Sequence, residues 1–331
     1  MFQIGRREFV CSIGTLIGGV AAGWPHAGNA QEPGRIYHLG DVHFSPRHTP
    51  WNDALFEAVK TDGFIEGQNL LLDAAGFGLR GSELAGHVAA IVKAQVDIII
   101  ATGDPPVRSA QQATKSIPIL AIAEDMVGSG FVASLAEPKG NTTGVSLLST
   151  ELNGKRQEIL IEALPAIKRM AILADTASVS PRQLQILQDA GRGRGVDFSI
   201  HGVTKREEIE GAINAAKDAG AGAINVLAST TLFNNREIIL ARTAALHLPA
   251  IYQWPDLADE GGLIGYGPRL VQIYHDIMAH QLVKLLRGIK PAEIPVEQPS
   301  KFQMWINLKV AKGYGLTIPE SLLLRADKVI E

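Results

Sequence analysis

The sequence predicts an α/β protein with two lobes, each built on a parallel β-sheet. Short apolar runs alternate with segments of helical periodicity along both halves of the chain, as in repeated βα units. The 34 glycines among 331 residues suit the tight turns that such repeats need. At roughly 150 residues per domain the length predicts two domains. The hydrophobic fraction of 46% excludes a disordered chain.

Residues 1–30 differ from the rest and have the three parts of an export signal. The pair Arg6-Arg7 precedes an uncharged stretch over residues 9–24, and a small-residue motif ends at Ala30. The arginine pair resembles a twin-arginine signal, while the general export route stays open. The uncharged stretch is shorter than the roughly 20 residues that a membrane-spanning helix needs. We therefore expect a cleaved signal peptide and a periplasmic mature protein.

The charge and the cysteine content narrow the function classes. The only cysteine, Cys11, lies within the predicted signal, so the mature chain would have no disulfide, no thiolate metal site and no cysteine nucleophile. The 31 basic and 34 acidic residues give a net charge of −3, unlike the basic balance of a nucleic-acid binder. We expect no cofactor, no metal and no catalytic residue.

The first half of the chain predicts four strands with helices between them. A proline pair after Asp104 predicts another helix, with Asp104 as its N-cap. Glu124 and Asp125 follow the fourth strand and are expected to cap a helix over residues 128–135. The strands are predicted at 35–40, 69–74, 96–101 and 117–122, and the helices at 52–62 and 83–94.

The second half repeats the alternation and implies a second parallel sheet with right-handed crossovers. Residues 291–299 are expected to form an extended, proline-marked connection. The strands are predicted at 169–174, 196–202, 223–227, 249–252, 262–267 and 302–306, and the helices at 182–191, 206–219, 234–246, 273–287 and 308–314.

Ligands of open α/β sheets bind beyond the carboxyl ends of the strands, so residues there are the candidates for a binding site. Carboxylates favour a ligand ammonium group, aromatic faces favour a flat or cationic group, and hydroxyls can bind a carboxylate. Several of these residues have structural alternatives, because the acidic ones can cap helices, His43 can be a solvated loop residue, and the aromatic ones can pack a hinge. The candidate ligand-binding residues are Asp41, His43, Phe44, Thr102, Gly103, Asp104, Glu124, Asp125, Asp175, Ser229, Thr230, Tyr252, Trp254 and Tyr266.

An enzymatic alternative comes from two short motifs. Asp41-Val42-His43 and Thr102-Gly103-Asp104 resemble the first two metal motifs of calcineurin-like phosphoesterases, whose ligands hold metals that activate water. The third motif of that family, Gly-Asn-His, would fall at residues 140–142, where the chain has threonine in place of histidine. The ligand set is incomplete, so an exported metal-dependent phosphoesterase is only an alternative.

A set of longer motifs carries a family resemblance over about residues 33–331. The motifs are DMVGSGFVASLA (125–136), GNTTGVSLL (140–148), ELNGKRQEIL (151–160), LPAIY (248–252), GGLIGYG (261–267), PVEQPSKF (295–302) and INLKVAKGYGLTIPESLLLRA (306–326). In this order they resemble the substrate-binding proteins of ABC transporters, in the family that includes tryptophan- and tyrosine-binding members. The chain departs from that family at Met126, where proline is usual, and in the loop 40–48, which is usually small and rich in serine and glycine.

The resemblance implies a type I periplasmic-binding-protein fold with two Rossmann-like lobes, three hinge crossings and a ligand in the cleft between the lobes. It also implies a monomeric, non-enzymatic receptor that delivers a small solute, an amino acid or related amine, to the permease of an ABC importer. A ligand-binding sensor domain is an alternative with the same fold. We expect a first lobe of residues 31–147 plus 258–292 and a second of 148–257 plus 293–331, with crossings near 146–150, 255–260 and 291–300.

Overall fold

The first lobe is built on a five-stranded parallel sheet. The computed structural model describes residues 34–331 of the chain, and the export signal predicted over residues 1–30 lies outside them. The sheet has the order β2-β1-β3-β4-β5. Its strands are β1 (Tyr37–Val42), β2 (Leu70–Leu72), β3 (Ile98–Thr102), β4 (Ile119–Ala123) and β5 (Thr142–Ser146).

Helices cover both faces of this sheet, so the central strands are apolar along their length. All five residues of β4 are buried, and the register places Asp41 of β1 beside Ile100 of β3. The helices near in sequence are α1 (Pro50–Thr61), α2 (Leu84–Lys93) and α3 (Asp104–Ala113), with the short 3₁₀ turn η1 (Ala74–Gly76).

A helical segment from late in the chain completes the first lobe. It consists of α9 (Leu270–Gln272), the π-helical turn η4 (Ile273–Met278) and α10 (Ala279–Leu286), and it packs against α1. The 3₁₀ turn η5 (Pro291–Glu293) follows and contacts β5.

The second lobe is built on a seven-stranded sheet of order β12-β11-β10-β9-β8-β6-β7. The pairing of β10 with β11 is antiparallel, and the other pairings are parallel. Its strands are β6 (Arg169–Asp175), β7 (Asp197–Val203), β8 (Ile224–Val226), β9 (Ala250–Tyr252), β10 (Ile264–Gly267), β11 (Gln303–Asn307) and β12 (Lys328–Ile330).

The helices of the second lobe enclose this sheet. α5 begins with a capping box, in which Ser180 and Gln183 exchange side-chain and backbone hydrogen bonds around Pro181. The helices are α4 (Ser149–Ala163), α5 (Pro181–Arg192), α6 (Ile209–Asp218), α7 (Thr230–Asn234), α8 (Arg236–Ala245), α11 (Leu308–Gly313) and α12 (Glu320–Leu323), with 3₁₀ turns η2 (Arg206–Glu208) and η3 (Pro255–Ala258).

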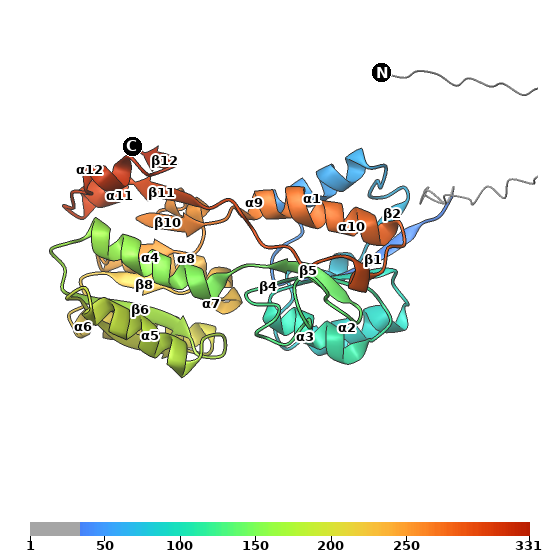
Figure 1. Ribbon diagram of the computed structural model, residues 1–331, viewed down its shortest axis with the longest axis horizontal. Coiled ribbons are helices and arrows are strands. Elements are labelled where there is room, and N and C mark those ends of the chain that lie inside the picture. Colours follow the sequence, from blue (N-terminus) through green and yellow to red (C-terminus); the bar gives the residue numbers. More distant parts are fainter. Residues whose placement is uncertain (1–33) are drawn as a thin grey trace, which may run out of the picture.

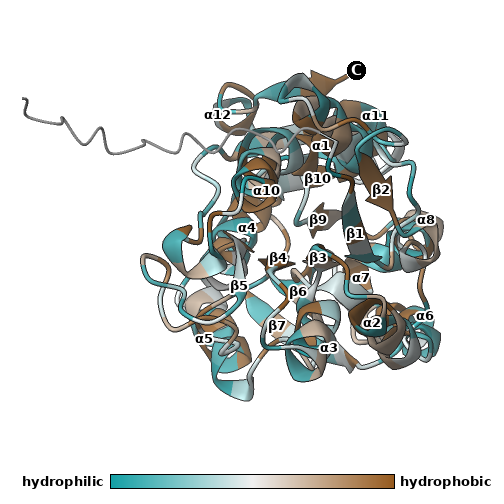
Figure 2. Cartoon of the chain, turned by 90° about the vertical axis from the view of Figure 1, so that its right-hand side faces the viewer, coloured by the Kyte–Doolittle hydropathy of each residue, from teal (hydrophilic) through white to brown (hydrophobic). Residues whose placement is uncertain are grey.

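The two lobes lie side by side and the chain passes between them three times (Figure 1). The surrounding helices carry hydrophilic stretches on their outward sides (Figure 2). The predicted two-lobed α/β fold is confirmed. In the described part of the chain, none of the helices combines the length and the apolar character that crossing a bilayer would require.

The positions of the crossings follow from sheet membership. The chain leaves the first sheet after Ser146 and enters α4 at Ser149. It returns between Gly267 of β10 and Leu270 of α9, and it leaves again between Glu297, which bridges to β5, and Gln303 of β11. The predicted crossing at 255–260, and with it the boundary at residue 258, comes too early, because β10 pairs with β9 and β11 of the second lobe.

Candidate functional site

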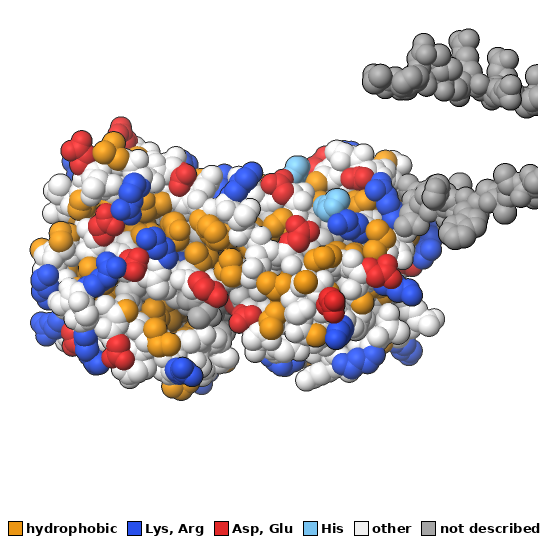
Figure 3. All heavy atoms as spheres, in the orientation of Figure 1, with side chains coloured by type: hydrophobic (Ala, Val, Ile, Leu, Met, Phe, Trp, Pro, Cys, Tyr) orange, Lys and Arg blue, Asp and Glu red, His pale blue; other side chains and the backbone are white. Residues whose placement is uncertain are grey.

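The carboxyl ends of the central strands of both sheets meet at the boundary between the lobes. β3 and β4 of the first lobe end there, as do β6 and β8 of the second lobe. Loops between parallel strands and their helices leave a crevice at this edge. Figure 3 shows a groove between the two lobes on one face of the molecule.

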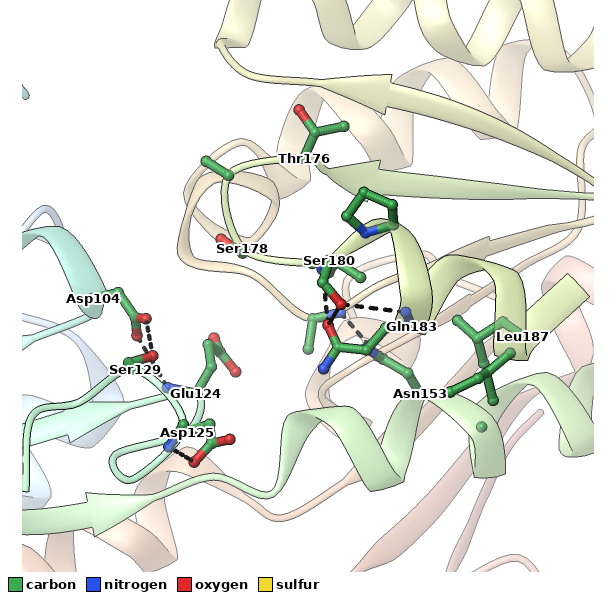
Figure 4. Close-up of a pocket in the computed structure, with 17 residues that line it drawn as sticks. Asp104, Glu124, Asp125, Ser129, Asn153, Thr176, Ser178, Ser180, Gln183 and Leu187 are labelled. Atoms are coloured by element: carbon green, nitrogen blue, oxygen red, sulfur yellow. Dashed lines mark hydrogen bonds between the residues drawn. The ribbon is translucent and has the colours of Figure 1, made fainter. Parts of the chain in front are cut away.

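The groove contains a cavity of about 500 Å³ whose two walls differ in chemistry (Figure 4). The first lobe contributes the carboxylates of Asp104, Glu124 and Asp125. No Lys, Arg or His of the described chain lines this cavity. The wall from the second lobe carries hydroxyl and amide side chains, namely Asn153, Thr176, Ser178, Ser180 and Gln183.

Asp104 is held in the first-lobe wall by two hydrogen bonds. The backbone N–H of Glu124 donates to Oδ1 (3.2 Å) and Ser129 Oγ donates to Oδ2 (2.9 Å). Burial raises the pKa of Asp104 above its usual range, and these hydrogen bonds oppose the shift. The prediction of Asp104 as the N-cap of α3 is wrong, because Gly103 takes that position with φ of 96° and the Asp104 carboxylate reaches across to the next loop.

The segment after β4 is a loop, not the start of a helix. Asp125 Oδ1 accepts a hydrogen bond from the N–H of Gly128 at 2.8 Å, which closes a tight turn. A Cβ at Gly128 would lie only 2.1 Å from Asp125 Oδ2, so any other residue there would displace the Asp125 carboxylate from this turn. The helix predicted over residues 128–135 is wrong, because this aspartate turn competes with helical hydrogen bonding.

Glu124 lies where several cavities meet. It lines the cavity of about 500 Å³, a smaller aromatic cavity and an outer cavity of about 760 Å³. The outer cavity is also lined by Arg80, Arg108 and Arg206, so cationic side chains lie at the mouth of the groove.

Asp175 orders the second-lobe wall from the end of β6. It is buried, and its two oxygens accept hydrogen bonds from the N–H of Ala177 (3.0 Å) and from Ser178 Oγ (3.1 Å). The resulting turn places Thr176, Ser178 and the N-terminus of α5 at the cavity. Asp175 itself lines the outer cavity.

A smaller cavity of about 50 Å³, lined by several aromatic side chains, also lies between the lobes. Trp254 is 5% exposed, and its ring meets that of Phe233 at 5.8 Å between centroids. Its indole Nε1 is buried without a hydrogen-bond partner. Tyr274 OH lies 3.2 Å from Thr102 Oγ1. The aromatic side chains that line the cavity are Phe44, Trp51, Phe233, Trp254 and Tyr274.

The lobes come very close beside this aromatic cavity. A Cβ at Gly103 of the first lobe would lie 2.7 Å from Thr230 Oγ1 of the second lobe. Both residues line the cavity. Glycine at this position therefore permits this close approach of the two lobes.

Five predicted site residues do not line these cavities. Ser229 caps α7, where its Oγ accepts a hydrogen bond from the N–H of Leu232. Tyr252 is buried with its hydroxyl 3.0 Å from Thr243 Oγ1, and Tyr266 packs against the core of the second lobe.

The other two of these five, Asp41 and His43, form a buried pair at the end of β1. The exposed fraction of His43 is 2%, so the expectation of a solvated loop residue is wrong. Its Nε2 lies 3.6 Å from Asp41 Oδ1, and its ring stacks on Phe77 with 5.0 Å between centroids. Burial raises the pKa of Asp41, and His43 opposes this shift. Packing against Phe77 buries the His43 side chain, although the composition of the loop suggests an exposed residue.

The alternative of a metal-dependent phosphoesterase requires a group of metal ligands. Within residues 34–331, no three His, Cys, Asp or Glu side chains are grouped so that they could hold a metal ion.

The predicted site missed residues of two kinds. The Ser-Pro-x-Gln pattern at residues 180–183 is a capping signature, and it could have placed the N-terminus of α5 at the cleft. Asn153, Trp51 and Tyr274 reach the cleft from helical segments whose packing no local pattern reveals.

The chain thus forms a two-lobed α/β protein with a cleft between its lobes. The model of the family "ABC transporter substrate binding protein" matches residues 49–330, and the chain belongs to this family. It is 24% identical over 268 residues to the tyrosine-binding protein of Clostridioides difficile, covering 78% of this chain and 75% of that relative.

Solved structures show the same fold. An ABC domain from Streptococcus pneumonia in complex with L-Trp aligns with a TM-score of 0.77 at 23% identity, over 89% of this chain and 100% of that one. A conserved domain protein from Vibrio cholerae gives 0.79 at 22% identity with the same coverage. The ligand-free, open form of a substrate-binding protein with adhesive properties from Clostridium difficile gives 0.61 at 20% identity, over 89% and 99%.

Proposed function

We propose that this chain is the extracytoplasmic solute receptor of an ABC importer and that it binds an amino acid in the cleft between its lobes. The observation that carries this proposal is the cavity of about 500 Å³, with three carboxylates on one wall and hydroxyl and amide groups on the other. A volume of this order suits a small metabolite.

The two walls match the two charged groups of an amino acid. Asp104, Glu124 and Asp125 can pair with an ammonium group through charge-assisted hydrogen bonds. The opposite wall contains the N-terminus of α5, a helix of 12 residues, whose dipole favours a carboxylate. The aromatic cavity next to Glu124 offers flat surfaces to an aromatic side chain.

Receptor function of this kind needs no bond chemistry. A solute binds one wall, the lobes close about the three connections, and the second wall completes the hydrogen bonds. Specificity follows because each polar group of the enclosed solute must find a partner. The closed monomer would then deliver the solute to the permease. The predicted signal and the periplasmic location belong to the same proposal.

A thermal-shift screen of amino acids, nucleosides, sugars and organic anions tests the solute class. A ligand at 100 times its dissociation constant adds about 2.7 kcal/mol to the free energy of unfolding, which is a measurable shift. Hits are expected among amino acids. Hits confined to sugars or dicarboxylates would overturn the solute class.

Calorimetric titrations with three related compounds then test which charged group of the solute each wall binds. L-tyrosine carries both charged groups, tyramine lacks the carboxylate, and 3-(4-hydroxyphenyl)propanoate lacks the ammonium. Tyramine is expected to keep part of the affinity, and the propanoate is expected to lose it because three carboxylates would face its own. Equal binding of the propanoate and L-tyrosine would contradict the assignment of the two walls.

A further inference from the structure

Arg156 is a buried cation of the second lobe that lies behind the cleft. Its side chain is 2% exposed. Nε donates to the carbonyl of Tyr266 (2.8 Å), Nη1 to Asn153 Oδ1 (3.0 Å) and Nη2 to the carbonyl of Gln253 (3.2 Å). These acceptors are neutral, so they satisfy the donors without neutralising the charge. Burying such a charge costs free energy, so a buried Arg156 needs a compensating role in the second lobe.

The partners of Arg156 are parts of the cleft wall. Asn153 lines the cavity of about 500 Å³, and its Oδ1 also accepts a hydrogen bond from the N–H of Ala228 at 3.2 Å. Gln253 follows β9 and lines the aromatic cavity, and Tyr266 belongs to β10. One guanidinium group therefore fixes α4 against the ends of two strands. The planar fork of arginine suits this task better than the single ammonium of lysine.

The charge that acts on Arg156 from the first lobe is that of Glu124. Burial lowers the pKa of Arg156 to about 10, and the negative charge of Glu124 opposes this shift. Glu124 shares one cavity with Asn153 and another with Gln253, both of them partners of Arg156. Because the two charges belong to different lobes, their attraction depends on how close the lobes are.

We propose that Arg156 is a positioning residue of the solute site, which orders the second-lobe wall and attracts Glu124 so that closure is favoured before a solute arrives. This inference rests on the proposed function, because it gives a role to the same cleft. When the lobes separate, Glu124 gains water while Arg156 stays buried behind its own wall. The attraction is then lost and the burial cost remains, so the closed arrangement gains stability from the pair.

Interlobe distances in the absence of solute test this directly. Spin labels at exposed Gln112 of α3 and Ala190 of α5, in a Cys11→Ser background, report the ratio of closed to open molecules. Arg156→Gln and Glu124→Gln are each expected to lower this ratio about tenfold, a coupling of ordinary size between sites. The double variant should lower it no further than either single variant.

Two further variants separate charge from position. Lys155→Gln removes a neighbouring exposed charge, paired with Glu158, from the same helix and should leave the ratio unchanged. Arg156→Lys keeps the charge and loses the fork. It is expected to keep most of the closed ratio while its affinity for L-tyrosine falls about tenfold.

Several results would overturn the proposal. They are an unchanged ratio in either single variant, effects that multiply in the double variant, or an Arg156→Lys variant as open as Arg156→Gln. If Arg156→Gln does not fold, Glu124→Gln alone decides, because an unchanged ratio there contradicts the attraction. The distances need no solute, whereas L-tyrosine titrated into the unaltered protein tests only the proposed function.

Discussion

The carboxylate of Asp104 combines a raised pKa with a position on the cavity wall. Asp104→Asn is expected to weaken binding of an amino acid about tenfold, because a charge-assisted hydrogen bond is replaced by a neutral one. Titration calorimetry measures this. Asp218→Asn, an exposed aspartate of α6, is the matched control and should bind normally. Equal affinity in both variants would show that Asp104 does not hold the ammonium.

The same carboxylate makes solute affinity depend on pH. The folded-state pKa is raised by burial, so the neutral form is favoured as the pH falls through a value above the ordinary 3.8. Only the ionised form pairs with an ammonium, so affinity should fall with decreasing pH through that value. Stability has the opposite sign, because the buried carboxyl favours folding at low pH and loses that contribution as the pH rises through the raised pKa. Asp104→Asn should flatten the fall in affinity.

The indole Nε1 of Trp254 is a candidate hydrogen-bond donor to the solute, and a substitution can test this role. Its Nε1 is buried without a partner and its ring lines the aromatic cavity. Trp254→Phe should change the free energy of unfolding little, since loss of an unpaired donor offsets lost packing, whereas Trp254→Ala should cost about 3–5 kcal/mol. If a bound solute accepts a hydrogen bond from Nε1, Trp254→Phe lowers its affinity several-fold. Urea unfolding and calorimetry separate the two effects, and unchanged affinity would exclude this contact.

At the scale of elements, the closest approach of the lobes depends on the turn between β3 and α3. A Cβ at Gly103 would lie 2.7 Å from Thr230 Oγ1, and its φ of 96° disfavours other residues. Gly103→Ala is therefore expected to hold the lobes apart and to weaken solute binding.

Thr230→Ala should partly restore closure in the Gly103→Ala variant, because it removes the hydroxyl that the new methyl group meets. Small-angle scattering with and without solute measures closure. If Gly103→Ala alone closes as well as the unaltered protein, this contact does not limit closure.

The elements that periodicity identifies correctly are those with one clear pattern. The continuous apolar run near residues 96–101 is the central strand β3, and the periodic segment near 83–94 is α2. β5 and α4 were not predicted. β5 (TTGVS) carries threonine, glycine and serine and becomes fully buried through its neighbours β4 and Glu297. Its strand character comes from pairing, which the local sequence does not reveal.

The sequence likewise identifies some of the candidate site residues and not others. The rule that ligands lie at strand ends identifies Thr102, Asp104 and Glu124, because each follows a recognisable strand. It does not distinguish Trp254, which lines the aromatic cavity, from Tyr252 two residues earlier, which is buried in the second lobe. The rotation of a strand against its covering helices decides such cases, and that rotation depends on packing between distant segments.

At the scale of the whole molecule, export should leave a mature chain that begins near Gln31. The charged start, the short uncharged stretch and the motif ending at Ala30 motivate this expectation. N-terminal sequencing of the periplasmic fraction measures it. Retention of Met1 in a membrane-bound product would contradict it. Replacing Arg6 and Arg7 with lysine should block export only if the twin-arginine route is used.

The order of the lobes along the chain also has a consequence for synthesis. The helix α1 near the start of the chain packs against residues 270–286, and the second sheet needs its last strands, β11 and β12. Neither lobe is complete on the ribosome until most of the chain has been translated. N-terminal domains usually fold first during synthesis, but the first lobe of this protein cannot be completed before its late segment has been made. Both lobes gain their last segments only late in synthesis, and until residues 270–286 have been made the nascent chain lacks the segment that packs against α1.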